Sequence, residues 1–461
     1  MAEDWRDARI AELQAALERA LARIEALEAQ IRQNSSNSSK PPSSDTPEQR
    51  RDRDKRAPTG RKPGGQPGHK PQRRDLLPPE RVSRTVEHYP HECAHCGTAL
   101  AAVEDREPFR HQVVDLPEIH ADVTEHRLHA AECAECGRRT RASLPMGVPR
   151  SMFGPRLLAL VALLTGVCRV SRRQAVMFLE DVLSIRVSLG ALSEGEQRVS
   201  QAVAPAVDEA LDFTLAQPVK HADATSWATG GAYRSLWTIS TALVTVFVIA
   251  KDGSRETVRR ILGKVHGILV SDRATVFGFW AMKWRQICWA HLLRKFAGFV
   301  ERKGAGSQIA RELQGTTEIV FHYWHRVRDG TMTRRAFRRW MKPIRARVED
   351  LLERGARLGA RGFSGTCSDI LDHREALWAF VDRDDVDPTN NLAERDLRPF
   401  VLWRKTSNGT QSERGERYAE RIMTVAHTLR KQRRSVFQYL HRACANHLYD
   451  NPPESLLPSF A

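Results

Sequence analysis

The first thirty residues carry apolar side chains at alternating steps of three and four positions. Glu and Arg flank this series, which consists of Ile10, Leu13, Leu17, Ala20, Ile24, Leu27 and Ile31. An a/d pattern over about three heptads predicts a coiled-coil helix at residues 1–33. Two interpretations stay open, because such a stripe fits self-association of two chains as well as a helix docked on the protein's own core.

Large apolar residues almost vanish in the next segment, which reads NSSNSSKPPSSD, then RRDRDKR, then GRKPGGQPGHK. This composition predicts a disordered basic linker over residues 34–84, because the segment has too little apolar surface to fold alone. Residues 32–84 hold 14 Lys or Arg and 6 Asp or Glu, a surplus of +8. Such a tether can lie along phosphates, and Arg61, Lys62 and Lys70 are its candidate DNA-binding residues. A solvated linker that binds nothing is the alternative.

Short β-prone runs follow at residues 85–148, where VSRTVEHY and VVDLPEIHADVTEHRLHA flank two cysteine pairs. Residues 149–215 change to helical periodicity, with Ser171 as a plausible N-cap. A helix-turn-helix is conceivable in this helical domain. Its second helix, SLGALSEGEQRVSQAVAPAVDEAL, is rich in Glu and poor in Arg, so packing or dimerisation is favoured over reading of the major groove.

Residues 216–291 alternate strand-like and helical segments. The expected strands are QPVKHADAT, SLWTIST, LVTVFVIA, GILVSD and WRQICWAH, with the helix SRETVRRILGKV before the fourth. This order is typical of one half of an α/β domain. We expect a helical insertion at 292–385, the second half of the domain at 386–430 and a C-terminal helical segment at 431–461. The predicted fold class is multidomain, α/β plus α.

Composition adds a partner class to this picture. The 461 residues include 72 Lys or Arg against 56 Asp or Glu, a net charge of +16, which points to a polyanion such as nucleic acid. The longest apolar stretch, at 157–168, is too short for a membrane span of about 20 residues, and no basic-then-apolar signal opens the chain. We therefore expect neither secretion nor membrane insertion.

Four of the eight cysteines form two CxxCG motifs, Cys93 with Cys96 and Cys133 with Cys136. Two such pairs present four thiolates that can close tetrahedrally on structural Zn²⁺, which predicts a zinc-binding DNA-binding domain at 85–148. Nearby histidines that could substitute as ligands are His91, His95 and His111. Cys288 and His291 are also spaced for a metal, but no second pair is evident, so packing beside an active site is favoured. The remaining thiols, Cys168, Cys367 and Cys444, look ordinary.

Three carboxylates stand where a metal site would need them. Asp223 and Asp272 each end an apolar strand, and Glu394 lies on a helix that we expect to begin near Pro388 or Thr389. Hard cations prefer oxygen ligands, and in-line attack on a phosphate uses two ions, so the set suits two Mg²⁺ ions, with Mn²⁺ as the alternative. Spacing alone is a weak argument, because the chain has 56 acidic residues.

Several motifs follow one another in order over nearly the whole chain: NSSNSSKPPSSD and GRKPGGQPGHK, the paired CxxCG motifs, HADATSW, CWAHLLRKF and DPTNNLAERDLRPFVLWRKTSNGTQSERGERYAERI. Together they resemble the IS66 family of bacterial insertion-sequence transposases. The resemblance implies an RNase H-like DDE transposase with Asp223, Asp272 and Glu394 as the metal-binding triad. Two departures from the family's pattern, Ala224 after Asp223 and Arg273-Ala274 after Asp272, leave these ligands intact. Asp252, in a turn, is a poor competitor for Asp272.

The implied activity is metal-dependent cleavage and strand transfer of double-stranded DNA, at terminal inverted repeats and a target. Supporting roles fall to His291, Asn390, Asn391, Arg395 and Arg398, and phosphate contacts to Arg404 and Lys405, although solvated helix faces explain these cations equally well. The family also implies two small accessory proteins and a cytoplasmic, nucleoid-associated location. The rival hypotheses are an inactive zinc-containing DNA-binding regulator derived from a transposase, and an RNase H-like nuclease acting on RNA.

Overall fold

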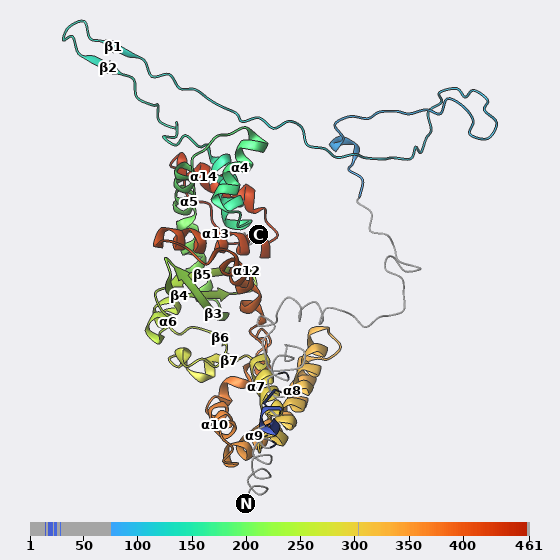
Figure 1. Ribbon diagram of the computed structural model, residues 1–461, viewed down its shortest axis with the longest axis vertical. Coiled ribbons are helices and arrows are strands. Elements are labelled where there is room, and N and C mark those ends of the chain that lie inside the picture. The colour runs from blue at the N-terminus through green and yellow to red at the C-terminus, as the bar shows by residue number, and fades with distance from the viewer. Residues whose placement is uncertain are drawn as a thin grey trace, which may run out of the picture.

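The computed structural model describes residues 75–302 and 304–458, together with helical positions at 14, 17–21, 23–24 and 28. Three blocks follow one another along the long axis (Figure 1): a helical insertion, a mixed β-sheet, and a group of helices that includes α5 and α14. Most of the predicted coiled coil and basic linker, with Arg61, Lys62 and Lys70, lies outside the described residues. Of the predicted seam, Leu17, Ala20 and Ile24 are described, all exposed.

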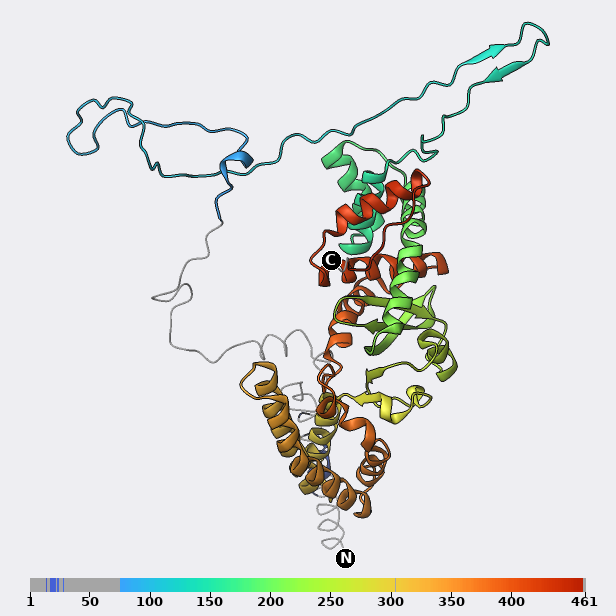
Figure 2. The same cartoon turned by 180° about the vertical axis from the view of Figure 1, so that it is seen from behind.

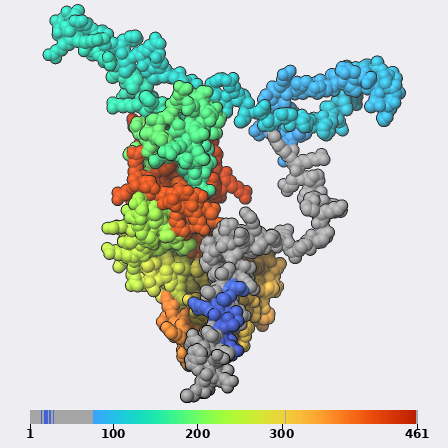
Figure 3. Space-filling model, in the orientation of Figure 1, coloured from blue at the N-terminus to red at the C-terminus, as the bar shows by residue number. Residues whose placement is uncertain are grey.

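Residues 75–148 extend away from the three blocks as two long arms (Figure 3). Their regular elements are the short helical turn η2 (Pro79–Arg81) and the strands β1 (Ala130–Glu132) and β2 (Arg139–Arg141), which form a hairpin. The prediction of strands at 82–89 and along 113–129 was wrong for this structure. These runs have no apolar layer to cover, and Val113 and Val123 remain 81% and 82% exposed.

The helical block begins after the arms. It contains α3 (Pro155–Ala162), the π-helical turn η3 (Leu163–Val167), α4 (Arg172–Leu183) and α5 (Leu189–Ala216). Ser171 caps α4 as predicted, because its hydroxyl accepts a hydrogen bond from the amide of Gln174 while the Gln174 side chain accepts one in return. Figure 2 shows α5 beside the C-terminal helices α13 (Glu413–Lys431) and α14 (Val436–Leu448).

The sheet has five strands in the order β5-β4-β3-β6-β7. Their bounds are Val219–Thr229 for β3, Ala232–Ser240 for β4, Thr245–Ala250 for β5, Ile268–Ser271 for β6 and Arg285–Ile287 for β7. β3, β4 and β5 pair antiparallel, whereas β6 and β7 run parallel to β3. The long apolar runs of β4 and β5 are buried on both faces, which matches the near-continuous hydrophobicity of their sequence.

Helices cover both faces of this sheet. One core joins β4 and β5 to α5, α13 and α12 (Asn391–Ser407) through Phe247, Phe400 and Ile422. The other face packs against α6 (Arg255–Leu262) and the turn η4 (Thr275–Phe277). α6 ends at Gly263, whose φ of 64° is the left-handed conformation that glycine adopts without strain.

The helical insertion has its own core. It is built by η5 (Met282–Trp284), α7 (Trp289–Glu301), α8 (Ser307–Arg328), α9 (Arg334–Arg357), α10 (Phe363–Asp372), η6 (Arg374–Leu377) and α11 (Ala379–Asp382). Buried aromatic rings, among them Trp289, Phe337 and Phe380, fill its centre. No helix in the described part of the chain is long and apolar enough to cross a bilayer.

The expected strand at 284–291 is a second correction. β7 stops at Ile287, and Trp289 already begins α7, with its amide donating to the carbonyl oxygen of Pro388. Apolar side chains continue across this boundary, so the hydrophobic pattern does not mark it. His291 therefore lies one helical turn after Cys288 on α7 instead of on a strand.

Candidate active site

Asp223 and Asp272 belong to neighbouring parallel segments of the sheet. Asp223 lies within β3, two residues after His221, which is paired with Val270 of β6, and Asp272 directly follows the last residue of β6. Adjacent strands are about 4.8 Å apart. The backbone amide of Ala224 donates a hydrogen bond to Oδ1 of Asp223 at 2.9 Å. In the same way, the backbone amide of Ala274 donates to Oδ1 of Asp272 at 3.0 Å. The sheet thus presents two oriented carboxylates side by side.

Asn390 joins the start of α12 to this sheet edge. Its side-chain amide donates to the carbonyl oxygen of Ala222 at 2.8 Å, and its backbone amide lies 3.1 Å from Sγ of Cys288. Because the amide nitrogen is the donor, Oδ1 accepts from Nδ1 of His221 at 3.2 Å, which assigns the proton of this neutral imidazole to Nδ1. The buried Asn390 therefore fixes the helix one turn before Glu394.

Glu394 lies close enough to the two aspartates to act on them electrostatically. Burial is the main reason that the pKa of Asp223 rises to about 7, and the negative charges of Glu394 and Asp272 raise it further, against the opposing hydrogen bond from Ala224 and the charge of Arg294. A carboxylate in this position favours the approach of a cation that would restore its charge. The three carboxylates of the predicted triad are therefore near enough to interact electrostatically.

Asp396 holds the same helix from its other side. One carboxylate oxygen accepts hydrogen bonds from the hydroxyls of Ser240 and Thr245, both at 2.7 Å, and lies 2.6 Å from Nζ of Lys431. Burial lowers the pKa of Lys431, and the charge of Asp396 opposes that shift. Asn390 and Asp396 thus fix α12 on both sides of Glu394.

Polar atoms without hydrogen-bond partners at Glu394 fit a metal ion. Its Oε1 is buried without a hydrogen-bond partner, as is Nδ1 of His291, and these two atoms are 3.6 Å apart. In the described part of the chain, Cys288, His291 and Glu394 form a group whose ligand atoms all lie within 4.8 Å of one another. Asp223 and Asp272 are not members of that group.

This geometry can be compared with known proteins. The model of the Transposase IS66 family matches residues 150–418, more than half of the chain and all three carboxylates. The chain belongs to the IS66 family of transposases. Residues 2–75 match a family of unknown function (DUF6444). No curated protein matches. The resemblance seen in the sequence is confirmed, and the match begins where the arms end.

The predicted phosphate-binding residues of this IS66 family member differ in their surroundings. Arg395, Arg398 and Lys405 are exposed on α12, as is Asn391. Arg404 instead donates through Nη1 to the hydroxyl of Thr225 at 3.0 Å and also contacts Ser226. Its guanidinium therefore helps to hold α12 on β3.

The two CxxCG motifs of the transposase adopt the same turn. In each, the first cysteine donates its amide to a carbonyl oxygen five residues later, and the glycine amide donates back to the first cysteine, all at 2.9 Å. Gly97 and Gly137 have φ values of 73° and 66°, which explains the glycine after each pair. Hydrogen bonds with Thr98 lower the pKa of Cys96 to about 7, and backbone amides at Cys136 and Glu135 lower that of Cys133. Both turns favour thiolates.

The structure does not gather these four cysteines. The second motif forms the tip of the β1–β2 hairpin, while the first lies in the blue segment on the other arm (Figure 1). None of the four belongs to the ligand group around Glu394. Zinc coordination by both pairs together therefore stays a prediction.

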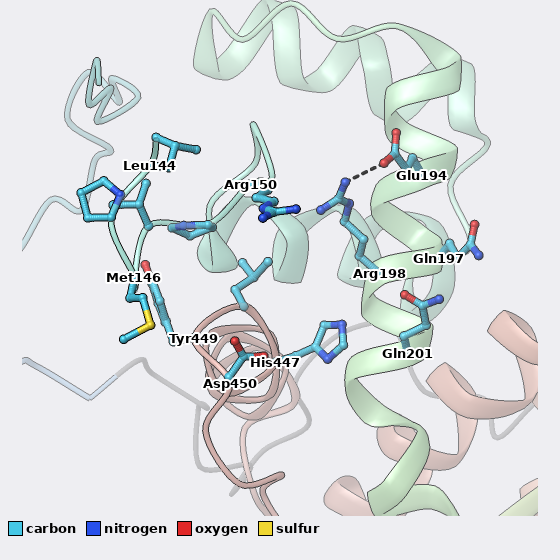
Figure 4. A pocket seen from close by; sticks show the side chains of 15 residues that line it. Leu144, Met146, Arg150, Glu194, Gln197, Arg198, Gln201, His447, Tyr449 and Asp450 are labelled. Carbon is cyan, nitrogen blue, oxygen red and sulfur yellow. Dashed lines mark hydrogen bonds and ion pairs between the residues drawn. The ribbon is translucent and has the colours of Figure 1, made fainter. Parts of the chain in front are cut away.

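The largest cavity among those described lies away from the carboxylates. It has a volume of about 680 Å³ and opens between the segment 144–150, α5 and the end of α14 (Figure 4). Arg198 and Glu194 pair at 2.6 Å on its wall, and Arg150 and His447 add further basic groups. No member of the triad lines it.

Sequence reasoning missed Arg294 and Asp396. Arg294 follows His291 by three positions, so helical spacing alone places both on the face that meets Glu394, with Arg294 Nη2 at 3.9 Å from Oε1. Asp396 carried no comparable signal, because its partners lie on β4, β5 and α13.

Proposed function

We propose that this IS66 family transposase cleaves and joins DNA at a site formed by Asp223, Asp272 and Glu394. The observation that supports the proposal is the electrostatic influence of Glu394 and Asp272 on the buried Asp223, together with an Oε1 of Glu394 that is buried without a hydrogen-bond partner. The sheet order, three antiparallel strands followed by two parallel ones, supports the RNase H-like fold that the family resemblance implies.

The three carboxylates would hold two divalent ions, Mg²⁺ or Mn²⁺. Ions bound there polarise a phosphate and lower the pKa of an attacking water. Asp223 and Asp272, fixed by main-chain amides, define where the ions sit, and Glu394 closes the site from α12. Exposed Arg395, Arg398 and Lys405 on the same helix are placed to neutralise the phosphates on either side of the scissile bond.

The proposed reaction has two stages. Water first attacks a phosphodiester at the end of the element, which frees a 3′-hydroxyl, and that hydroxyl then attacks a phosphodiester of the target. The two CxxCG arms and the basic segment at 34–84 would bind the terminal inverted repeats. Leu17 and Ile24, exposed on the N-terminal helix, support self-association, which would bring two DNA ends together. The proposed partners also include the two small accessory proteins that the family resemblance implies.

A cleavage assay tests the function. The chain is incubated with a labelled inverted-repeat duplex and, separately, with an RNA–DNA hybrid of the same sequence, with and without Mg²⁺. We expect nicking of the duplex only, dependent on the metal. Binding without nicking would favour the inactive regulator, and cleavage of the hybrid alone would favour the RNA nuclease.

A further inference from the structure

Cys288, His291 and Glu394 form a ligand set whose chemistry differs from that of the three carboxylates. We propose that this set binds a borderline metal ion of the Zn²⁺ type, and that such an ion withdraws Glu394 from the Mg²⁺ site and so inhibits cleavage. The inhibitory half rests on the proposed function, whereas the binding half does not. Sequence spacing favoured packing for Cys288 and His291 because no further ligand was evident, and α12 supplies one.

The separation of the ligand atoms supports a shared ion. Nδ1 of His291 and Oε1 of Glu394 are 3.6 Å apart, too far for a hydrogen bond, and neither atom has a hydrogen-bond partner. Two ligands at about 2.1 Å from a tetrahedral ion are about 3.4 Å apart. The observed separation is therefore close to one edge of a zinc coordination shell. Sγ of Cys288 lies within 4.8 Å of both atoms. A shift of the sulfur by about 1 Å would therefore bring it to bonding distance of the shared ion.

The donor set selects the class of ion. A thiolate and an imidazole are softer ligands than the carboxylates and waters that Mg²⁺ prefers, and together with one carboxylate they suit Zn²⁺ or Co²⁺. Three protein ligands leave a fourth position for water. Cys288 also has the outer support that such ligands need, because the backbone amide of Asn390 points at its sulfur from 3.1 Å.

The Zn²⁺-type ion and Mg²⁺ compete, because both proposed sites use the carboxylate of Glu394. Its carboxylate cannot close the Mg²⁺ site with Asp223 and Asp272 while its Oε1 is held toward His291. Arg294, 3.9 Å from the same oxygen, opposes any cation there and limits the affinity. The site therefore behaves as an open, reversible site instead of a closed structural one.

Cobalt absorption tests the binding half in the full-length chain. Co²⁺ is titrated into protein whose knuckle cysteines (Cys93, Cys96, Cys133 and Cys136) are changed to Ser, with a phosphine reductant present. We expect a thiolate-to-cobalt band that saturates near one equivalent. Cys288→Ala should abolish the band, and His291→Ala should weaken apparent affinity by about tenfold or more. Cys444→Ala, which removes another buried thiol, should leave it unchanged.

Two results would overturn binding: no thiolate band at all, or a band that survives Cys288→Ala. Because Cys288 is fully buried, thermal melting checks that each variant is folded. If Cys288→Ala does not fold, His291→Ala tests the site instead, because the side chain of His291 is partly exposed.

The inhibitory half is read from cleavage at fixed Mg²⁺ with increasing Zn²⁺. Each variant is normalised to its own zinc-free rate, and Cys288→Ala should raise the inhibitory Zn²⁺ concentration by about tenfold or more. An unchanged inhibitory concentration would contradict competition for Glu394. If the chain cleaves no DNA, the proposed function fails while the cobalt titration still decides the binding site.

Discussion

The side-chain amide of Asn390 donates a hydrogen bond to the main-chain carbonyl oxygen of Ala222 across 2.8 Å. Ala222 immediately precedes Asp223, and Asn390 is one helical turn before Glu394. A single buried amide thus ties the strand that carries one proposed metal ligand to the helix that carries another. We regard Asn390 as a positioning residue, because its contacts go to the protein's own backbone and to His221 and Cys288.

Replacing Asn390 should therefore affect metal-dependent cleavage more than replacing the neighbouring Asn391. Asn390→Ala leaves the carbonyl of Ala222 without its donor, at a cost of about 1–3 kcal/mol in unfolding free energy. It should also raise the Mg²⁺ concentration needed for half-maximal cleavage, because Glu394 is no longer held against Asp223. Asn391→Ala, at an exposed neighbouring position, is the matched control. Equal Mg²⁺ dependence in both variants would argue against a positioning role.

Asp396 makes a prediction about stability. Asp396→Ala removes the partner of Lys431 and the acceptor of two hydroxyls, and a buried charge left unpaired costs about 3–5 kcal/mol. Urea unfolding should show that loss, whereas Asp385→Ala at an exposed position should change stability by less than about 0.5 kcal/mol. A loss below about 1 kcal/mol for Asp396→Ala would mean that the contacts of Asp396 contribute little to stability.

Local sequence signals predicted the strand of Asp223, the strand before Asp272 and the helix of Glu394, because apolar runs, caps and turn residues act over a few positions. The expected strand end at Asp223 was wrong, because β3 continues to Thr229. The clamp residues were not predictable in the same way. Asn390 was expected only to support the active site, and its side chain does not cap α12 but binds the backbone of β3. Likewise, the start of α7 depends on the contact between Trp289 and Pro388, which no local pattern encodes.

His221 predicts a pH dependence. Burial lowers its pKa from 6.5 to about 4, partly offset by the hydrogen bond to Asn390. Between those two pH values the unfolded chain binds a proton that the folded chain does not, so stability falls as pH falls through that window. The full contribution is about 3 kcal/mol. The unfolding free energy of the wild type, relative to His221→Gln, should decline from pH 6.5 toward 4; a constant difference would contradict the assignment.

The CxxCG motifs predict tightly bound zinc. Metal analysis of the purified chain should find about one zinc that survives dialysis against a weak chelator, as expected for four thiolates. Cys133→Ser with Cys136→Ser should remove it, and Cys168→Ser, an exposed cysteine outside both motifs, should not. Zinc-free wild-type protein would remove the structural role of these motifs, and zinc retained by the double variant would place it elsewhere.

The central claim is that Asp223, Asp272 and Glu394 form one metal-dependent DNA-cleaving site. The most direct measurement is Mg²⁺-dependent nicking of a labelled inverted-repeat duplex by Asp272→Asn, alongside DNA binding by the same protein. Asp252→Asn, in the turn after β5, serves as the control. We predict that Asp272→Asn binds the duplex like the wild type but leaves it intact, while Asp252→Asn cleaves normally. Nicking by Asp272→Asn at the wild-type rate would contradict the account.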